Sequence, residues 1–167
     1  CPFPPPANRL KLPIRAGVLD CVLMHGGIHH VNDRAGLFRE VHRVLKPGGR
    51  FVWREPVNDF FLWRLLRAII YRLSLTLDAD TERPLRRLET LAALETAGFE
   101  VESWTTHGFL GFCLFMNSDV LVFNRLLRFI PGIRFWARAA AAFDKAVLRL
   151  PGLRGSGLQV VGSARKR

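Results

Sequence analysis

Residues 18–56 read VLDCVLMHGGIHHVNDRAGLFREVHRVLKPGGRFVWREP, and this stretch decides the fold class. Residues 18–24 form a short apolar run that is typical of a strand buried on both faces. Asp33 then suits the N-cap of a helix, which Pro47-Gly48-Gly49 ends before a second strand at residues 50–55. The apolar stripe of that helix comprises Leu37, Phe38, Val41, Val44 and Leu45. Strand, helix and strand in this order predict a right-handed βαβ unit.

Beyond this unit the pattern becomes mixed. Helices are predicted at 60–77 and 84–97, and the alternation of residues 99–105 predicts a half-exposed strand. A long insertion at 106–156 follows, in which we expect two helices at about 118–130 and 133–150. Residues 157–164 predict a last strand. The fold class is therefore α/β.

The composition bounds the class of protein. The chain has 167 residues, of which 49% are hydrophobic and 23% charged, and its formal net charge is +11. These fractions are typical of one globular domain and exclude disordered, collagen-like and coiled-coil chains. Three widely spaced cysteines, Cys1, Cys21 and Cys113, argue against a disulfide framework and favour a reduced, cytoplasmic chain.

The positive charge favours a polyanionic partner, which is either a nucleic acid or an anionic membrane surface. The aromatic residues lie in apolar runs, and this argues against nucleic-acid stacking. Residues 60–77 are apolar but carry three arginines, each costing about 2.5–3.5 kcal/mol in a bilayer centre, so a membrane span is excluded. A peripheral membrane location stays open, with four aromatic residues near the lipid headgroups: Trp63, Tyr71, Phe129 and Trp136.

Several motifs in the first third of the chain resemble a known family. They are Leu12-Pro13 before the first strand, Asp20 within it, HHVND at 29–33, REVHRVLKPGG at 39–49, and Glu55-Pro56 after the second strand. Together they resemble the second half of a class I S-adenosylmethionine-dependent methyltransferase domain of type 11. The broad group in question includes the ubiquinone and menaquinone methyltransferases.

The resemblance implies a partial Rossmann-like sheet with the strand order 18–24, 50–55, 157–164, 99–105. Residues 1–167 would form a single partial domain, with lid-like helical insertions at 57–83 and 106–156. The first strand would lie at an edge that is open to self-association. The family's glycine-rich turn and the acidic residue that binds the donor ribose have no counterpart here, so we expect a missing N-terminal segment.

The resemblance also implies a site. The residues predicted to bind S-adenosylmethionine are Asn8, Met24, His25 and Gly26, and the candidate catalytic residues are His29, His30 and Glu55. Each has a structural alternative: the histidines pack against the next helix, the glycine loop only adopts positive φ, and Glu55 pairs with Arg54, His29 or a helix N-terminus. No metal site is expected, because no carboxylate or cysteine accompanies the histidines at a ligand spacing.

The function implied by the resemblance is methyl transfer to a hydrophobic small molecule or a lipid-like acceptor. The apolar, lid-like insertions favour such an acceptor. The alternative is a non-catalytic basic module that binds an anionic membrane or a partner chain.

Overall fold

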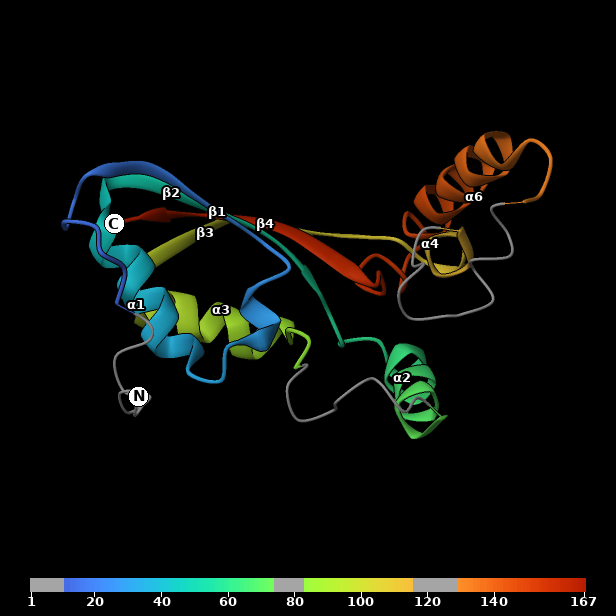
Figure 1. Ribbon diagram of the computed structural model, residues 1–167, viewed down its shortest axis with the longest axis horizontal. Helices are drawn as coiled ribbons and strands as arrows, with labels where there is room; N and C mark the ends of the chain where they lie inside the picture. Colours follow the sequence, from blue (N-terminus) through green and yellow to red (C-terminus); the bar gives the residue numbers. More distant parts are fainter. Residues whose placement is uncertain (1–10, 74–82, 116–128) are drawn as a thin grey trace, which may run out of the picture.

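A computed structural model describes residues 11–73, 83–115 and 129–167. A sheet of four strands runs through this part of the chain in the order β1-β2-β4-β3 (Figure 1). The strands are β1 (Leu19–His25), β2 (Leu45–Pro56), β3 (Phe99–His107) and β4 (Gln159–Lys166). This order confirms the α/β prediction and the predicted arrangement of the strands.

The strand directions bring one set of strand ends together. β1 is parallel to β2, and β4 is antiparallel to both β2 and β3. The carboxyl ends of β1, β2 and β3 therefore meet the amino end of β4 at one edge of the sheet, which we call the carboxyl edge. Open α/β sheets bind their ligands at this edge.

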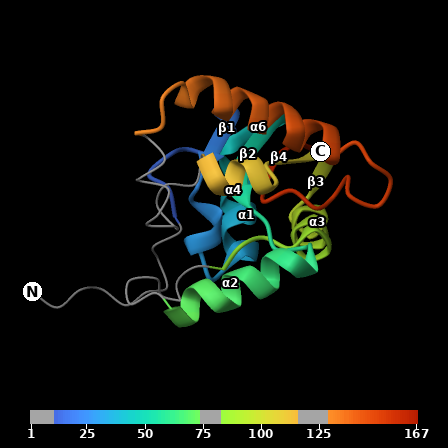
Figure 2. The same cartoon turned by 90° about the vertical axis from the view of Figure 1, so that its right-hand side faces the viewer.

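Helices cover one face and one end of the sheet. The helices α1 (Arg34–Val44) and α3 (Arg87–Thr96) pack under one face (Figure 1). The helices α2 (Phe61–Leu73), α4 (Leu110–Phe115) and α6 (Ile133–Val147) lie beyond the carboxyl edge. Figure 2 looks at this end of the molecule, where α4 lies between α2 and α6.

The main core lies between the sheet and the pair α1 and α3. In β2, Phe51, Trp53 and Glu55 are buried and alternate with more exposed neighbours, as the period of two in a strand requires. Phe38 of α1 and Phe99 of β3 complete the aromatic centre of this core. A smaller cluster joins Trp63 of α2 to residues of α4, of the carboxyl end of α6 and to Leu158, which precedes β4.

The helix α1 begins and ends through identifiable contacts. The Asp33 carboxylate accepts a hydrogen bond of 2.8 Å from the Gly36 N–H, which confirms the predicted N-cap. Four of the five residues of the predicted stripe are buried within the helix, while Leu45, also buried, already begins β2. At the other end, the Lys166 ammonium donates to the carbonyls of His42 and Leu45. A side chain of β4 therefore provides hydrogen bonds to carbonyl groups at the carboxyl end of α1.

Some predicted boundaries were wrong. β2 begins at Leu45 and not at residue 50, because Leu45 pairs with Leu19 of β1. The helix predicted at 84–97 begins at Arg87, because Leu85 is buried in a bridge with Val57. The short helix α4 was not predicted. The expected helix at 118–130 lies almost wholly outside the described residues, as do residues 74–77 of the helix predicted at 60–77.

Two predicted environments are also corrected. β1 was expected to be buried on both faces, but Leu23 is 70% exposed, because the described part of the chain pairs β1 only with β2 and packs helices on one face only. Trp63 was expected near lipid headgroups but is buried, and its indole N–H donates to the Ser156 carbonyl. The side chain of Tyr71 lies outside the described part. None of the described helices is long and apolar enough to cross a bilayer.

We predict that Gly162→Ala lowers the stability of the fold by about 1–3 kcal/mol, because overpacking a filled core costs that much. A Cβ atom at position 162 would overlap the indole ring of Trp53. Gly155→Ala is the matched control, since a Cβ atom there meets nothing within 4 Å. Urea unfolding of both variants measures the effect. Equal stability of the two variants would contradict the packing of Gly162 on Trp53.

Candidate active site at the carboxyl edge of the sheet

The loop after β1 turns back beneath the sheet. Gly26 adopts φ +64°, a conformation that favours glycine, and its N–H donates to the Arg54 carbonyl of β2. A single turn of 3₁₀ helix, η2 (Ile28–His30), follows directly. Ile28 is fully buried in the main core. The loop therefore places His29 and His30 beside the end of β2.

Glu55 organises this loop. Its side chain is buried, and the carboxylate accepts hydrogen bonds from the N–H groups of Gly27 (2.8 Å) and Ile28 (2.9 Å). The other carboxylate oxygen lies 2.7 Å from Nδ1 of His29. Of the alternatives open from the sequence, the structure shows pairing with His29 and with the helix N-terminus. Arg54 instead donates to Gln159.

The pKa of Glu55 reflects two opposed effects. Burial raises the pKa of this carboxyl group, whereas hydrogen bonds from His29, Ile28 and Gly27 lower it, and the net pKa lies below the ordinary value. The carboxylate is therefore ionised at neutral pH. An ionised Glu55 favours the His29 tautomer that carries its proton on Nδ1, which leaves Nε2 as a free acceptor. Such a nitrogen can take a proton from a bound hydroxyl group.

The other predicted residues lie near this pair but differ in their surroundings. His30 is exposed, and its ring centroid lies 3.9 Å from that of His29. Met24 is half-buried, whereas His25 is exposed and pairs with Arg54 in the strand register. Asn8 lies outside the described residues. The structure thus groups His29, His30 and Glu55, and it places Met24, His25 and Gly26 at the adjoining end of β1.

The backbone at the end of β1 leaves space for a ligand. A Cβ atom built on Gly26 would meet no heavy atom within 4 Å, so the chain here is open on that side. Among residues 11–73, 83–115 and 129–167, no group of three or more histidine, cysteine or acidic side chains is arranged to hold a metal ion.

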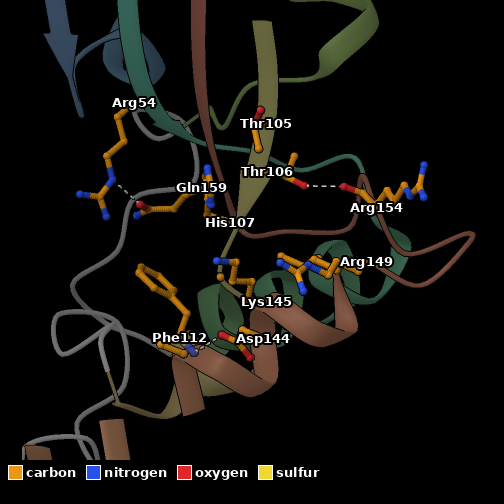
Figure 3. Close-up of a pocket in the computed structure, with 13 residues that line it drawn as sticks. Arg54, Thr105, Thr106, His107, Phe112, Asp144, Lys145, Arg149, Arg154 and Gln159 are labelled. Atoms are coloured by element: carbon orange, nitrogen blue, oxygen red, sulfur yellow. Dashed lines mark hydrogen bonds between the residues drawn. The ribbon is translucent and has the colours of Figure 1, made fainter. Parts of the chain in front are cut away.

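A cavity of about 780 Å³, not predicted from the sequence, lies at the same edge (Figure 3). It lies between the ends of β2, β3 and β4 and the helices α4 and α6. The residues that line it are Arg54, Thr105, Thr106, His107, Gly108, Phe112, Ala141, Asp144, Lys145, Leu148, Arg149, Arg154 and Gln159. The one available signal was the spacing of four between Lys145 and Arg149, which puts two cations on one helical face.

Comparisons with known proteins agree with the fold and the motifs. A family described as a methyltransferase domain matches residues 6–53. The ubiquinone/menaquinone biosynthesis C-methyltransferase UbiE of Proteus mirabilis is 34% identical, with 59% of this chain and 46% of the relative covered. The UbiE protein of Escherichia coli K12 is 33% identical, with 52% and 31% covered. The chain thus spans less than half the length of these relatives.

Solved structures share the fold at low sequence identity. A methyltransferase from Thermotoga maritima has a TM-score of 0.57 at 20% identity, covering 95% of this chain and 61% of that one. The geranyl diphosphate C-methyltransferase of Streptomyces coelicolor has a TM-score of 0.51 at 17% identity, covering 95% and 50%. The [4+2]-cyclase SpnF also matches, with a TM-score of 0.53 at 20% identity, covering 94% and 53%. These likenesses concern the fold, which by itself does not fix the reaction.

The strand order and the solved structures show a fold of the class I S-adenosylmethionine-dependent methyltransferase type, and the matched methyltransferase domain agrees over residues 6–53. The resemblance seen in the sequence is therefore confirmed. Among curated proteins, the chain is related to the UbiE C-methyltransferases of ubiquinone and menaquinone biosynthesis.

We predict that Glu55→Gln destabilises the protein by about 1–3 kcal/mol at pH 7, because it removes a buried charged acceptor. A carboxyl group whose pKa is lowered in the folded state stabilises the folded protein at pH values above its unfolded pKa of about 4.3. That contribution is lost as the pH falls through the folded pKa. The gap between wild type and Glu55→Gln should therefore narrow below pH 4.

Urea unfolding at pH 7 and pH 3.5 measures this gap. The control is Glu95→Gln, which changes an exposed glutamate of α3 and should leave the free energy of unfolding within about 0.5 kcal/mol. An equal loss from Glu55→Gln at both pH values would mean that the ionised carboxylate is not the source of the stability.

Proposed function

We propose that the protein takes part in methyl transfer from S-adenosylmethionine to the ring of a reduced, apolar quinone. The pair formed by His29 and Glu55 carries this proposal, because it puts an oriented base at the carboxyl edge. The related UbiE proteins, named as C-methyltransferases of ubiquinone and menaquinone biosynthesis, support the acceptor class. The chain covers 46% of the Proteus mirabilis relative, so the activity of that whole protein is a proposal for this chain.

The described residues fit one part of the donor. The open backbone around Gly26 and the half-buried Met24 would hold its methionine portion, with His25 at the rim. Asn8 would contact the adenine by the family resemblance. When bound, the donor supplies an electrophilic methyl group on a sulfonium. The protein's contribution is then mainly to position the acceptor and exclude water.

His29 acts as the base in this proposal. A reduced quinone ring carries hydroxyl groups, and loss of a hydroxyl proton makes the neighbouring ring carbon a stronger nucleophile. Nε2 of His29 accepts that proton, and the Glu55 carboxylate stabilises the imidazolium that results. His30, whose ring lies against His29, would contact the acceptor.

The insertions at 57–83 and 106–156 are proposed as the lid over the acceptor. Their described helices lie beyond the carboxyl edge in Figure 1, where such a lid would have to lie. Apolar side chains remain exposed on them, including Phe61, Leu65 and Leu114. An apolar acceptor would cover part of this surface and bring the stabilisation that buried apolar area provides.

A peripheral membrane contact is a second candidate, favoured by one observation. Phe135, Trp136 and Phe143 of α6 are each more than half exposed, as is Phe129, and Arg134 and Arg138 lie on the same helix. Aromatic and basic side chains on one helix suit the interface of an anionic bilayer. A quinone acceptor would itself reside in such a bilayer.

We predict that His29→Gln lowers kcat for methyl transfer by about 10²–10⁴, the usual contribution of a general base. The affinity for S-adenosylmethionine should stay within about twofold, because His29 lies beside the donor residues and is not one of them. The assay is transfer of a labelled methyl group to a reduced prenylated quinone, with calorimetry for donor binding. Glu95→Gln is the control and should retain wild-type kcat.

Two results would overturn the proposed function. One is the absence of donor binding to the folded protein. The other is an unchanged kcat in His29→Gln, which would leave His29 and Glu55 with a structural role only.

A further inference from the structure

None of the described residues proposed for donor binding or for catalysis lines the cavity. Glu55 points into the main core, so the adjacent side chain of Arg54 points to the other face of β2. Gln159 and His107 pair in the register of β4 and β3 and lie with Arg54 at the cavity (Figure 3). The cavity therefore shares β2 with the proposed base but takes no side chain from the pair formed by His29 and Glu55.

Three cations line the cavity. Arg54, Lys145 and Arg149 carry them, and Figure 3 shows Lys145 and Arg149 reaching from α6 and its following turn toward the strand ends. In the described ranges, Lys145 and Arg149 form no ion pair. Arg154 contributes mainly its backbone, since its carbonyl accepts from the Thr106 hydroxyl and its side chain extends away.

The single acidic residue of the lining is already engaged. Asp144 is buried, and its carboxylate accepts hydrogen bonds from the N–H groups of Phe109, Gly111 and Phe112 at 2.7–2.8 Å. It therefore holds the start of α4, and both of its oxygens are occupied by backbone N–H groups. The cavity keeps a net positive lining that an anion would complement.

Arg54 is oriented before any ligand arrives. Its Nε–H donates to the Gln159 side chain at 2.8 Å, which fixes the plane of the guanidinium. The remaining four N–H groups of a guanidinium are geometrically suited to phosphate or carboxylate oxygens. A site that is already oriented loses less entropy when it binds its ligand.

The remaining wall is apolar. Phe112 of α4 and Ala141 and Leu148 on the α6 side line the cavity beside the cations. Its volume of about 780 Å³ lies in the range of small-molecule sites. A cavity lined by both cations and apolar side chains matches a molecule that has an anionic head and an apolar body.

We propose that this cavity binds an amphipathic phosphate. Its head lies among Arg54, Lys145 and Arg149, and its apolar body lies against Phe112 and Leu148. The ligand is either a soluble phosphorylated metabolite or the headgroup region of an anionic lipid, which share this chemistry. The proposal goes beyond methyl transfer, because it rests on residues outside the proposed donor and base sites and does not need the donor.

The test is calorimetric titration of the full chain with octyl phosphate below its micellar concentration. Octanol and inorganic phosphate separate the contributions of the apolar body and of the head, and both should bind at least about tenfold more weakly. The double variant Lys145→Gln/Arg149→Gln should lose at least about tenfold in affinity for octyl phosphate. Raising the salt concentration should weaken binding to the wild type.

The matched control is Arg39→Gln/Arg87→Gln, which removes the same charge from exposed positions of α1 and α3 outside the cavity. It should bind within about twofold of wild type. Ala141→Phe, which fills the cavity without changing its charge, should also weaken binding at least about tenfold. Circular dichroism confirms that each variant is folded.

The outcomes are distinct. Equal binding of octanol, or an equal loss in the control double variant, would overturn the proposal, since the first shows an apolar site and the second a diffuse charge effect. Binding of phosphatidylglycerol vesicles but not of octyl phosphate would also overturn it. Loss of vesicle and octyl phosphate binding together in the cavity variants would support it and identify the lipid source. Because no donor is present, methyl-transfer failure does not affect the result.

Discussion

The rest of the structure at the carboxyl edge depends on one carboxylate, that of Glu55. It accepts from the backbone of Gly27 and Ile28, so the chain leaving β1 is fixed against the end of β2. The same carboxylate contacts Nδ1 of His29 and selects its tautomer. Burial alone would make such a charge costly, and the hydrogen bonds offset that cost. A single side chain therefore couples the shape of the loop to the chemistry that the loop can perform.

A second buried carboxylate, that of Asp144, binds backbone N–H groups in the insertion. The helix α4 has only six residues, too few to be stable alone, and Asp144 of α6 caps its start from more than thirty residues away. Gly111 allows the close approach, because a Cβ atom there would overlap the backbone of Ala140. Lys166 likewise closes the end of α1 from the last strand. Long-range charged caps thus hold the short elements around the sheet.

Features that depend on residues close together in sequence were predicted, and features that depend on residues far apart were not. The helix α1 and its Asp33 cap were predictable because their signals are local, and the strand order followed from the family resemblance. His29 and a helix N-terminus were among the partners expected for Glu55, whereas the helix α4 and the cavity were not predicted, because they depend on residues distant in sequence. The apolar run of β1 indicated a capacity for burial, but the described chain leaves Leu23 exposed at an edge. The roles of His29 and His30 remain predictions.

The way the insertion joins the sheet makes its length nearly independent of the sheet. The Leu158 N–H donates to the Gly108 carbonyl at 2.9 Å, so the segment between them leaves and re-enters the sheet at one closed neck. The pairing of β3 with β4 therefore does not depend on the length of the segment between Gly108 and Leu158. Doubling the length of such a loop costs only about 0.6 kcal/mol of closure entropy. The length of this segment can therefore change while the pairing of β3 with β4 stays intact.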